Sequence, residues 1–361
     1  MLIKERWVVL DVLKAVCVIA MIVGHNLIWW YFNYKYGPPN DPLVIPIARF
    51  LFGPLALTIM SIPFTAGIAL RFFFNKGWDL KNHKLALGRQ PYLINVFKTV
   101  LFLVALGFAL NFFIWDARHL LSYLFSWNVL QFFALSLLVI TLFLKLLPSK
   151  FLLLTGFFVL FSAPFLRNFF QSDGVSYLEM VFFGYKNGLH IWPFFPWFSI
   201  VVFGFAVANF YIVNGNKKFN ALLLSVGIAL LVIAFITKSF SPMLNLKDIW
   251  GPTLFQPPTL RVIGQLGFIS LLLLFSNLIF AKRNLAKYGV LNVFSHGILY
   301  IYLFHFAFGF WFTTLMRATS QLRFFLLSLL IQFVLAYSIG TIVVFLKFKN
   351  KQSKFHLTDN E

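Results

Sequence analysis

Charged residues are scarce in this sequence. Only 11% of its 361 residues are Asp, Glu, Lys or Arg, whereas 60% are hydrophobic. A soluble domain carries about 25% charged residues, so this chain lacks the polar side chains that a water-facing surface requires. The same composition excludes a disordered chain and a coiled coil. We therefore expect an all-α polytopic membrane helix bundle.

Cysteine and acidic residues are also rare. The single cysteine, Cys17, permits neither an intramolecular disulfide nor a Cys-based metal cage. The histidines are dispersed, so we expect no bound metal. Only 10 acidic residues oppose 30 basic ones, which gives a formal net charge of +20. In a soluble protein this excess would indicate nucleic-acid binding, but in a membrane protein it first indicates the positive-inside bias.

Long apolar stretches dominate what is present. About 20 mostly apolar residues suffice to cross a bilayer. The first stretch follows basic residues but has no signal-peptide cleavage site, so it is kept as a span. The fifth is short, and the second is long and interrupted by prolines. The predicted spans are residues 8–30, 43–70, 92–114, 120–144, 151–166, 192–213, 219–237, 262–281, 289–316 and 324–346. They predict one membrane domain, residues 1–346, and a basic cytoplasmic tail, residues 347–361.

The basic residues also predict the orientation of the chain. Placing both termini in the cytoplasm puts 18 basic residues in the inner segments and nine in the outer ones. This bias agrees with the positive-inside rule. Because the inner basic residues are spread over five loops and both termini, they form no single nucleic-acid-binding face, and we expect no nucleic-acid partner.

Ionisable residues inside the first predicted span mark a candidate site. Such a group costs at least about 2.5–3.5 kcal/mol near the bilayer centre. The span holds Asp11, Lys14 and His25. At 100° per residue all three share one helix face, and His25 lies roughly 16 Å beyond Lys14, toward the outer side. A buried ion pair below a satisfied histidine is the structural alternative, but the shared face favours a functional site.

Polar residues before or within four other spans are expected at a similar depth, in the outer half of the bundle. Interhelical hydrogen bonds are an equally good explanation for Asn128 and Gln131, and snorkelling to the outer surface is an alternative for Arg49. The polar set comprises Arg49, Asn128, Gln131, His190 and His305.

Aromatic residues gather at the outer side, and a basic aromatic loop is expected at the inner side. Most tryptophans, including Trp127, Trp192 and Trp197, fall near the outer surface, where interfacial anchoring explains most of them and sugar stacking is compatible. The loop 71–91 carries five basic residues. Anionic lipid headgroups are the simpler explanation for this loop, and a phosphorylated cytoplasmic donor is the other.

Four short motifs occur in order along the chain. They are Leu10-Asp11-x2-Lys14-x10-His25, Trp127-x2-Leu130-Gln131, Pro193-x2-Pro196-Trp197 followed by Gly204, and Tyr300-Ile301-Tyr302-Leu303-Phe304-His305. As a set they resemble the motifs of the transmembrane acyltransferase superfamily, in particular heparan-alpha-glucosaminide N-acetyltransferase-like bacterial membrane proteins, which are related to the acyltransferase-3 family. Two features depart from the pattern. Lys14 stands where the family has arginine, so bidentate contacts are lost, and residues 31–42 lack the histidine proposed as active in the lysosomal enzyme.

The resemblance implies a multi-pass enzyme of the bacterial inner membrane. Such an enzyme moves an acyl group, most often acetyl, from cytoplasmic acetyl-CoA or another acyl-CoA to a carbohydrate or glycolipid acceptor on the outer side. His25 would then be the general base that deprotonates the acceptor hydroxyl or amine. His305 or His190 would orient the acceptor or stabilise the oxyanion.

The same resemblance assigns binding roles to further residues. Asp11 and Lys14 would hold the first helix at the donor entrance. Arg71, Lys84 and Lys98 would meet the phosphates of CoA. The remaining expected substrate-binding residues are Arg49, Trp127, Asn128, Gln131, Trp192, Trp197 and Tyr302.

Two other classes of protein stay open. One is a secondary transporter or flippase for a sugar or lipid-linked sugar. Proton-coupled transporters usually bury acidic relays, whereas Asp11 is the only acid within a predicted span, and no inverted repeat is evident. The other is a structural membrane subunit, which leaves the polar residues of five spans unexplained. No feature of the sequence specifies an oligomeric state.

Overall fold

The computed structural model describes residues 7–31, 61–74, 78–79, 84–85, 90–114, 126–170, 177–183, 192–237, 257–283, 289–317 and 322–358. The chain divides into two compact units. The central unit takes its described residues from 60–274, and the terminal unit combines residues from 7–59 with those from 275–361. The N-terminal helix therefore belongs to the same unit as the C-terminal helices.

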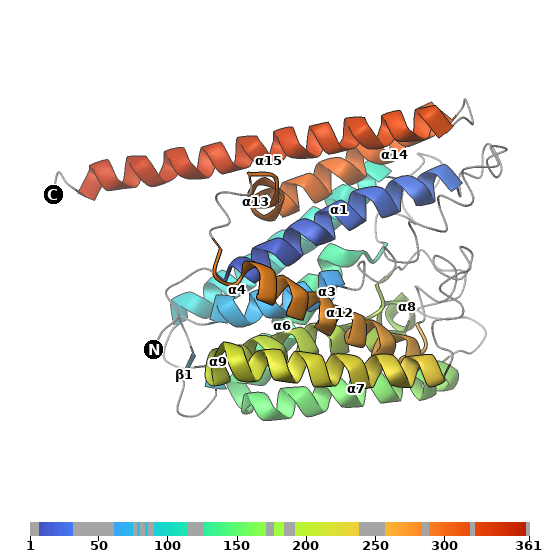
Figure 1. The fold of residues 1–361 in the computed structure, drawn as a ribbon, viewed down its shortest axis with the longest axis vertical. Coiled ribbons are helices and arrows are strands. Elements are labelled where there is room, and N and C mark those ends of the chain that lie inside the picture. Colours follow the sequence, from blue (N-terminus) through green and yellow to red (C-terminus); the bar gives the residue numbers. More distant parts are fainter. Residues whose placement is uncertain are drawn as a thin grey trace. The chain divides into compact units, whose positions relative to one another are not determined.

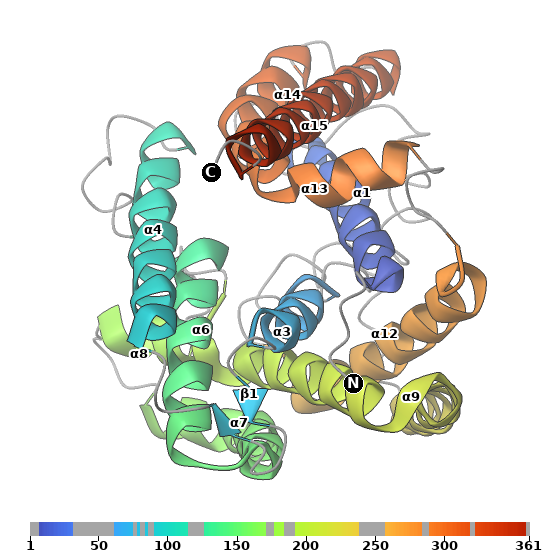
Figure 2. The same cartoon turned by 90° about the vertical axis from the view of Figure 1, so that its left-hand side faces the viewer.

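The terminal unit is a bundle of long apolar helices (Figures 1 and 2). Helix α1 packs on α13, and α13 packs on α15. The core between them includes Ile22, Phe294, Ile301 and Ala336. Helix α13 runs through the π-helical turn η5 into α14 without a break. The elements are α1 (Val8–Tyr31), α13 (Gly289–Phe304), η5 (His305–Gly309), α14 (Phe310–Arg317) and α15 (Leu322–Thr358).

The central unit is also helical, with one very short hairpin. Helix α9 packs on α3 and α7, and α4 packs on α6, as Figure 2 shows. Strands β1 and β2 pair in antiparallel fashion. The elements are α3 (Ser61–Phe73), β1 (Trp78–Asp79), β2 (Lys84–Leu85), α4 (Gln90–Ile114), α6 (Val129–Leu146), α7 (Ser149–Phe170), α8 (Tyr177–Phe183), α9 (Phe194–Ile236) and most of α12 (Thr259–Phe280).

Two glycines set the closest helix contact of the central unit. A Cβ atom added to Gly67 of α3 would overlap the backbone carbonyl of Val201, and one added to Gly204 of α9 would overlap that of Phe64. Each glycine thus lies against the backbone of the other helix. Small residues that let two backbones approach are a common basis of helix packing in membranes.

The structure confirms the predicted class. Eight of the described helices are long and apolar enough to cross a membrane. Helices suit this environment because they satisfy their own backbone hydrogen bonds in lipid. All ten predicted spans overlap described helices. Helix α9 contains the sixth and seventh spans, which Gly215 separates with a φ of +74°, a conformation that glycine adopts readily.

Several predicted boundaries were wrong. The fourth span was expected from residue 120, but residues 126–128 are not helical and α6 begins at Val129. The fifth span is not short, because α7 has 22 residues. Helices also extend into the expected loop 71–91, since α3 ends at Phe73 and α4 begins at Gln90. The helical backbone of α15 continues through most of the expected tail to Thr358.

Candidate functional site

Two histidines from distant parts of the sequence meet inside the terminal unit. His25 lies near the end of α1, and His305 opens η5. Nδ1 of His25 lies 3.2 Å from Nε2 of His305. One imidazole must donate this hydrogen bond and the other must accept it, because a neutral ring carries one N–H and one bare nitrogen. The contact therefore couples the protonation of one ring to that of the other.

Aromatic rings enclose this histidine pair. Trp29 stacks on both imidazoles, with ring centroids 5.3 Å from His25 and 5.0 Å from His305. Phe306 meets His25 edge-on at 4.5 Å. Tyr302, a predicted binding residue, packs its ring on Phe306 at 4.9 Å. The rings limit the access of water, and a low local dielectric strengthens hydrogen bonds to the imidazoles.

The π-helical turn η5 explains where His305 points. A π-helical turn carries one more residue than an α-helical turn, so it rotates the side chains that follow, and such turns are frequent at functional sites. Gly309 closes the turn. A Cβ atom at this position would lie 2.8 Å from both Gln332 Oε1 and Trp29, and 3.2 Å from Nδ1 of His305. Glycine is therefore needed for α1, η5 and α15 to converge here.

A buried amide network lies directly beside the histidine pair. Asn26 Nδ2 donates to Gln332 Oε1, and Gln332 Nε2 donates to Asn26 Oδ1, each at 2.8 Å. Thr313 and Ser328 also donate to Asn26 Oδ1, at 3.0 and 3.1 Å. All four residues are at least 95% buried. An unsatisfied amide in an apolar interior costs several kcal/mol, so the reciprocal pair fixes α1 against α14 and α15 next to His25.

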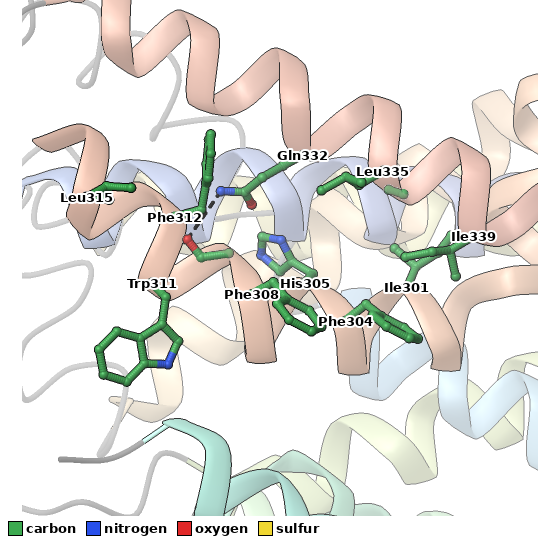
Figure 3. Close-up of a pocket in the computed structure, with 12 residues that line it drawn as sticks. Ile301, Phe304, His305, Phe308, Trp311, Phe312, Leu315, Gln332, Leu335 and Ile339 are labelled. Carbon is green, nitrogen blue, oxygen red and sulfur yellow. Dashed lines mark hydrogen bonds between the residues drawn. The ribbon is translucent and has the colours of Figure 1, made fainter. Parts of the chain in front are cut away.

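A cavity of about 600 Å³ opens beside His305 (Figure 3). Its volume is in the range of small-molecule sites. His305 and Gln332 line it together with the Gly309 backbone, and all other lining residues are apolar. The lining is Ile301, Phe304, His305, Phe308, Gly309, Trp311, Phe312, Leu315, Gln332, Leu335, Ala336 and Ile339.

The predicted ion pair of the first span is present. Lys14 Nζ lies 3.8 Å from Asp11 Oδ1. Ser295 of α13 donates a hydrogen bond of 2.6 Å to the same carboxylate oxygen. Asp11 is buried, while Lys14 is about a quarter exposed. Asp11 and His25 thus both contact the α13–η5 segment, as the shared helix face predicts.

Loss of the Asp11 carboxylate is expected to loosen the contact between α1 and α13. Asp11→Ala removes the acceptor of a buried hydroxyl, so we expect a loss of about 1–3 kcal/mol in the free energy of unfolding. The ion pair with the partly exposed Lys14 adds less. A double-mutant cycle with Ser295→Ala, measured by unfolding in detergent, should give a coupling of about 0.5–3 kcal/mol.

Ser338→Ala is the matched control for this cycle. Ser338 is exposed on α15, and its hydroxyl donates to Val334 O of its own helix. We expect its removal to change stability by less than about 0.5 kcal/mol. Strictly additive effects of Asp11→Ala and Ser295→Ala would contradict the proposed contact.

The predicted residues around Trp127 form the start of α6. Asn128 is the N-cap, and its side chain accepts from the backbone N–H of Leu130 while Gln131 accepts from the N–H of Asn128, which is a capping box. Asn128 Nδ2 donates to Asn111 Oδ1 and Gly107 O of α4. Trp127 donates to Trp192 O. These polar groups therefore stabilise a helix start and its contact with α4.

The tryptophans of the third motif are buried in the central unit. Trp197 is fully buried and Trp192 is 9% exposed, with their ring centroids 4.6 Å apart. The neighbouring Phe194 stacks on Phe198 at 4.4 Å. In this arrangement the two indole rings pack on protein rather than present an open face to a sugar.

The expected CoA-binding residues lie in three different environments. Arg71 is completely buried in the last turn of α3, not in a surface loop, and its Nε donates to Asn209 Oδ1 at 2.8 Å. Lys98 is exposed on α4. Lys84 is described only by its backbone in β2. His190 and Arg49 lie outside the described residues.

The amide network was not predicted from the sequence. Asn26, Thr313, Ser328 and Gln332 are single polar residues in apolar helices, a pattern that alone indicates only interhelical hydrogen bonding. The position of Asn26 next to His25 is the one signal that was available. Among the described residues, no group of three or more His, Cys, Asp or Glu is placed to hold a metal ion.

The fold and this site define a polytopic helical membrane protein with a histidine pair beside an apolar cavity. The chain belongs to the heparan-alpha-glucosaminide N-acetyltransferase catalytic family: the family's sequence model, described as "Heparan-alpha-glucosaminide N-acetyltransferase, catalytic", matches residues 6–243. This match confirms the family resemblance and covers three of the four motifs, whereas the fourth, Tyr300 to His305, lies beyond the matched residues. Comparisons with curated proteins and with solved structures gave no match. The matched segment includes α1 and His25 but ends before His305 and Gln332.

Proposed function

We propose that this protein transfers an acyl group, in the first instance acetyl, from cytoplasmic acyl-CoA to a hydroxyl or amine of an envelope carbohydrate on the outer side of a bacterial inner membrane. The family is one of membrane acetyltransferases. The observation that carries the proposal is the histidine pair: His25, in the matched segment, bonds to His305 at the wall of a cavity large enough for a substrate.

The pair supplies the proton transfers that the reaction needs. A thioester is already activated, so the enzyme must deprotonate the acceptor and protonate the leaving thiolate. One imidazole takes the proton of the acceptor hydroxyl or amine. At the same time the oxygen or nitrogen of the acceptor forms a bond to the acyl carbon. The bond from this carbon to sulfur then breaks, and the same proton passes to the CoA thiolate. The second imidazole stabilises the positive charge on the first during the transfer.

The geometry changes the roles that we expect for the two histidines. His305 lines the cavity, and Nδ1 of His25 is directed at His305. His305 is therefore the better candidate to touch the acceptor, and His25 is its partner for the proton. Lys98, which is exposed on α4 of the central unit, stays a proposed contact for the phosphates of the donor.

Reconstitution tests the proposed function directly. The full chain is placed in proteoliposomes with radiolabelled acetyl-CoA on one side and extracted envelope glycans on the other. Transfer of label to the glycan supports the proposal, and its dependence on the side of donor addition reports the orientation. Uptake of sugar or lipid-linked sugar without acyl-CoA, in the absence of any acetyl transfer, would instead indicate a transporter or flippase.

A further inference from the structure

The cavity beside His305 is far more apolar than an acetyl-CoA site requires. None of its twelve lining residues carries an acidic side chain, a lysine or an arginine. CoA is a polyphosphate, and phosphates are bound by cationic side chains or helix N-termini. An acetyl group has two carbons and cannot fill about 600 Å³. Binding of the donor therefore does not account for most of the volume of this cavity, whichever way the thioester approaches the histidines.

The character of the walls changes along the cavity (Figure 3). At one end the lining is Ile301, Leu335 and Ile339, together with the ring of Phe304. In the middle lie the two polar side chains, His305 and Gln332. At the other end Trp311, which is 55% exposed, presents an indole ring. An indole has an apolar face and a polar edge. It therefore packs against a sugar ring better than an aliphatic side chain would.

The middle of the cavity contains a polar atom that points to a ligand. His305 is 94% buried, because only 6% of its surface is exposed. Its Nδ1 atom is buried and has no hydrogen-bond partner among the described residues, although the Gln332 amide lies beside it. Its other ring nitrogen is occupied by His25. A hydroxyl or amine at this position would give Nδ1 a partner.

We infer that the cavity binds the acceptor, and that the acceptor is a glycolipid. Its hydrocarbon chain lies against Ile301, Leu335 and Ile339, its sugar lies against Trp311, and the reacting hydroxyl or amine reaches Nδ1 of His305. The inference deepens the proposed acyl transfer and rests on it for the identity of the reacting group. Apolar walls on both sides of the two polar side chains, with Trp311 at the end away from Ile301 and Ile339, assign the substrate class: a sugar joined to a long alkyl chain.

Photolabelling tests this assignment without using catalysis as the readout. The probe is hexadecyl glucosaminide with a diazirine in its alkyl chain, added to the full chain in phosphatidylcholine proteoliposomes. We expect label in peptides that contain residues 301–315 and 332–339. Unlabelled hexadecyl glucosaminide should compete at least about tenfold better than methyl glucosaminide, because each buried methylene adds a few-fold to affinity.

A pair of leucine variants on α15 provides the matched comparison. Leu335→Trp fills the aliphatic end of the cavity, whereas Leu330→Trp adds the same ring to a 60% exposed position on the same helix that does not line the cavity. Labelling should fall by about tenfold in Leu335→Trp and stay unchanged in Leu330→Trp. Both positions are exposed, so neither variant is expected to prevent folding.

Three outcomes would overturn the assignment. If phosphatidylglycerol displaces the probe as well as the glycolipid does, the cavity holds bulk bilayer lipid only. If methyl glucosaminide competes as well as hexadecyl glucosaminide, the alkyl chain contributes nothing. If the two leucine variants are labelled equally, the label reflects partition into lipid. Selective labelling without acetyl transfer would contradict the proposed function alone, whereas acetyl transfer without selective labelling would contradict the glycolipid subsite alone.

Discussion

Replacing either His25 or His305 by alanine is expected to lower acetyl transfer by about 100-fold or more. General acid–base catalysis by one positioned side chain contributes about 10²- to 10⁴-fold. Because the two rings share one hydrogen bond of 3.2 Å, they should act as a unit. The double variant should therefore be no more than a few-fold slower than the worse single variant, as groups that act together are not additive.

The measurement is the initial rate of label transfer from acetyl-CoA in proteoliposomes, with protein folding checked by gel filtration in detergent. His296→Ala is the matched control, since His296 lies on α13 and its ring bonds to Asn292 O of the same helix. We expect it to retain most of the activity. Full activity in His25→Ala would refute the assignment, and multiplied losses in the double variant would show that the two histidines work independently.

Replacing Gly204 by valine is expected to have the largest effect on stability. The added side chain would collide with the backbone carbonyl of Phe64 on α3. Backbone atoms of a packed helix cannot rotate away, so α3 and α9 must separate along their whole contact. Overpacking a well-packed interior usually costs about 1–3 kcal/mol, and a clash with backbone should fall at or above the top of that range. Gly67→Val should have a similar effect, because its side chain would collide with the backbone carbonyl of Val201 on α9.

Thermal unfolding in detergent and the yield of monodisperse protein measure this effect. Gly289→Ala is the control, since an added Cβ atom there would meet nothing within 4 Å at the start of α13. It should leave the unfolding midpoint unchanged or raise it slightly, because alanine favours helix more than glycine does. A Gly204→Val protein as stable as the Gly289→Ala protein would show that the two helices are not in close contact.

The first helix could be predicted well because its charges are costly in lipid. Asp11, Lys14 and His25 are three ionisable residues in one apolar stretch, and helical periodicity alone places them on one face. The structure agrees, since Asp11 meets Ser295 and His25 meets His305. The partners themselves could not be predicted: they lie more than 270 residues away, and sequence spacing gives no register between helices so far apart.

At the start of α6 the expected interhelical hydrogen bonds are present for Asn128, which donates to Gly107 O and Asn111 Oδ1 of α4, but the capping role of Asn128 and Gln131 was not predicted. Asn128 and Gln131 have the spacing of a capping box, which predicts a helix that begins at Val129. Because apolar residues precede them, the span was expected to begin earlier, and both residues were then placed inside a helix where their side chains lacked a local role. A cap satisfies backbone donors that would otherwise be unpaired at a helix start, and this requirement accounts for both side chains.

Arg71 was placed in a loop for a similar reason. A charged residue at the end of an apolar stretch is expected at the membrane surface, but α3 continues through Phe73 and buries the guanidinium against Asn209. Asn209 accepts one of the guanidinium hydrogens, that of Nε. The partner is 138 residues away in the sequence, so local patterns could not reveal it.

The membership of α1 in the terminal unit has a consequence for biosynthesis. The N-terminal helix leaves the ribosome first, yet its partners at positions 295 and 305 follow some 280 residues later. At typical rates of translation this interval is on the order of tens of seconds. During it, Asp11, His25 and Asn26 must stay in the membrane or its insertion machinery without their native partners. The histidine pair is therefore incomplete until the segment that carries His305 has been inserted, and a ribosome that stops before it releases a protein without this pair.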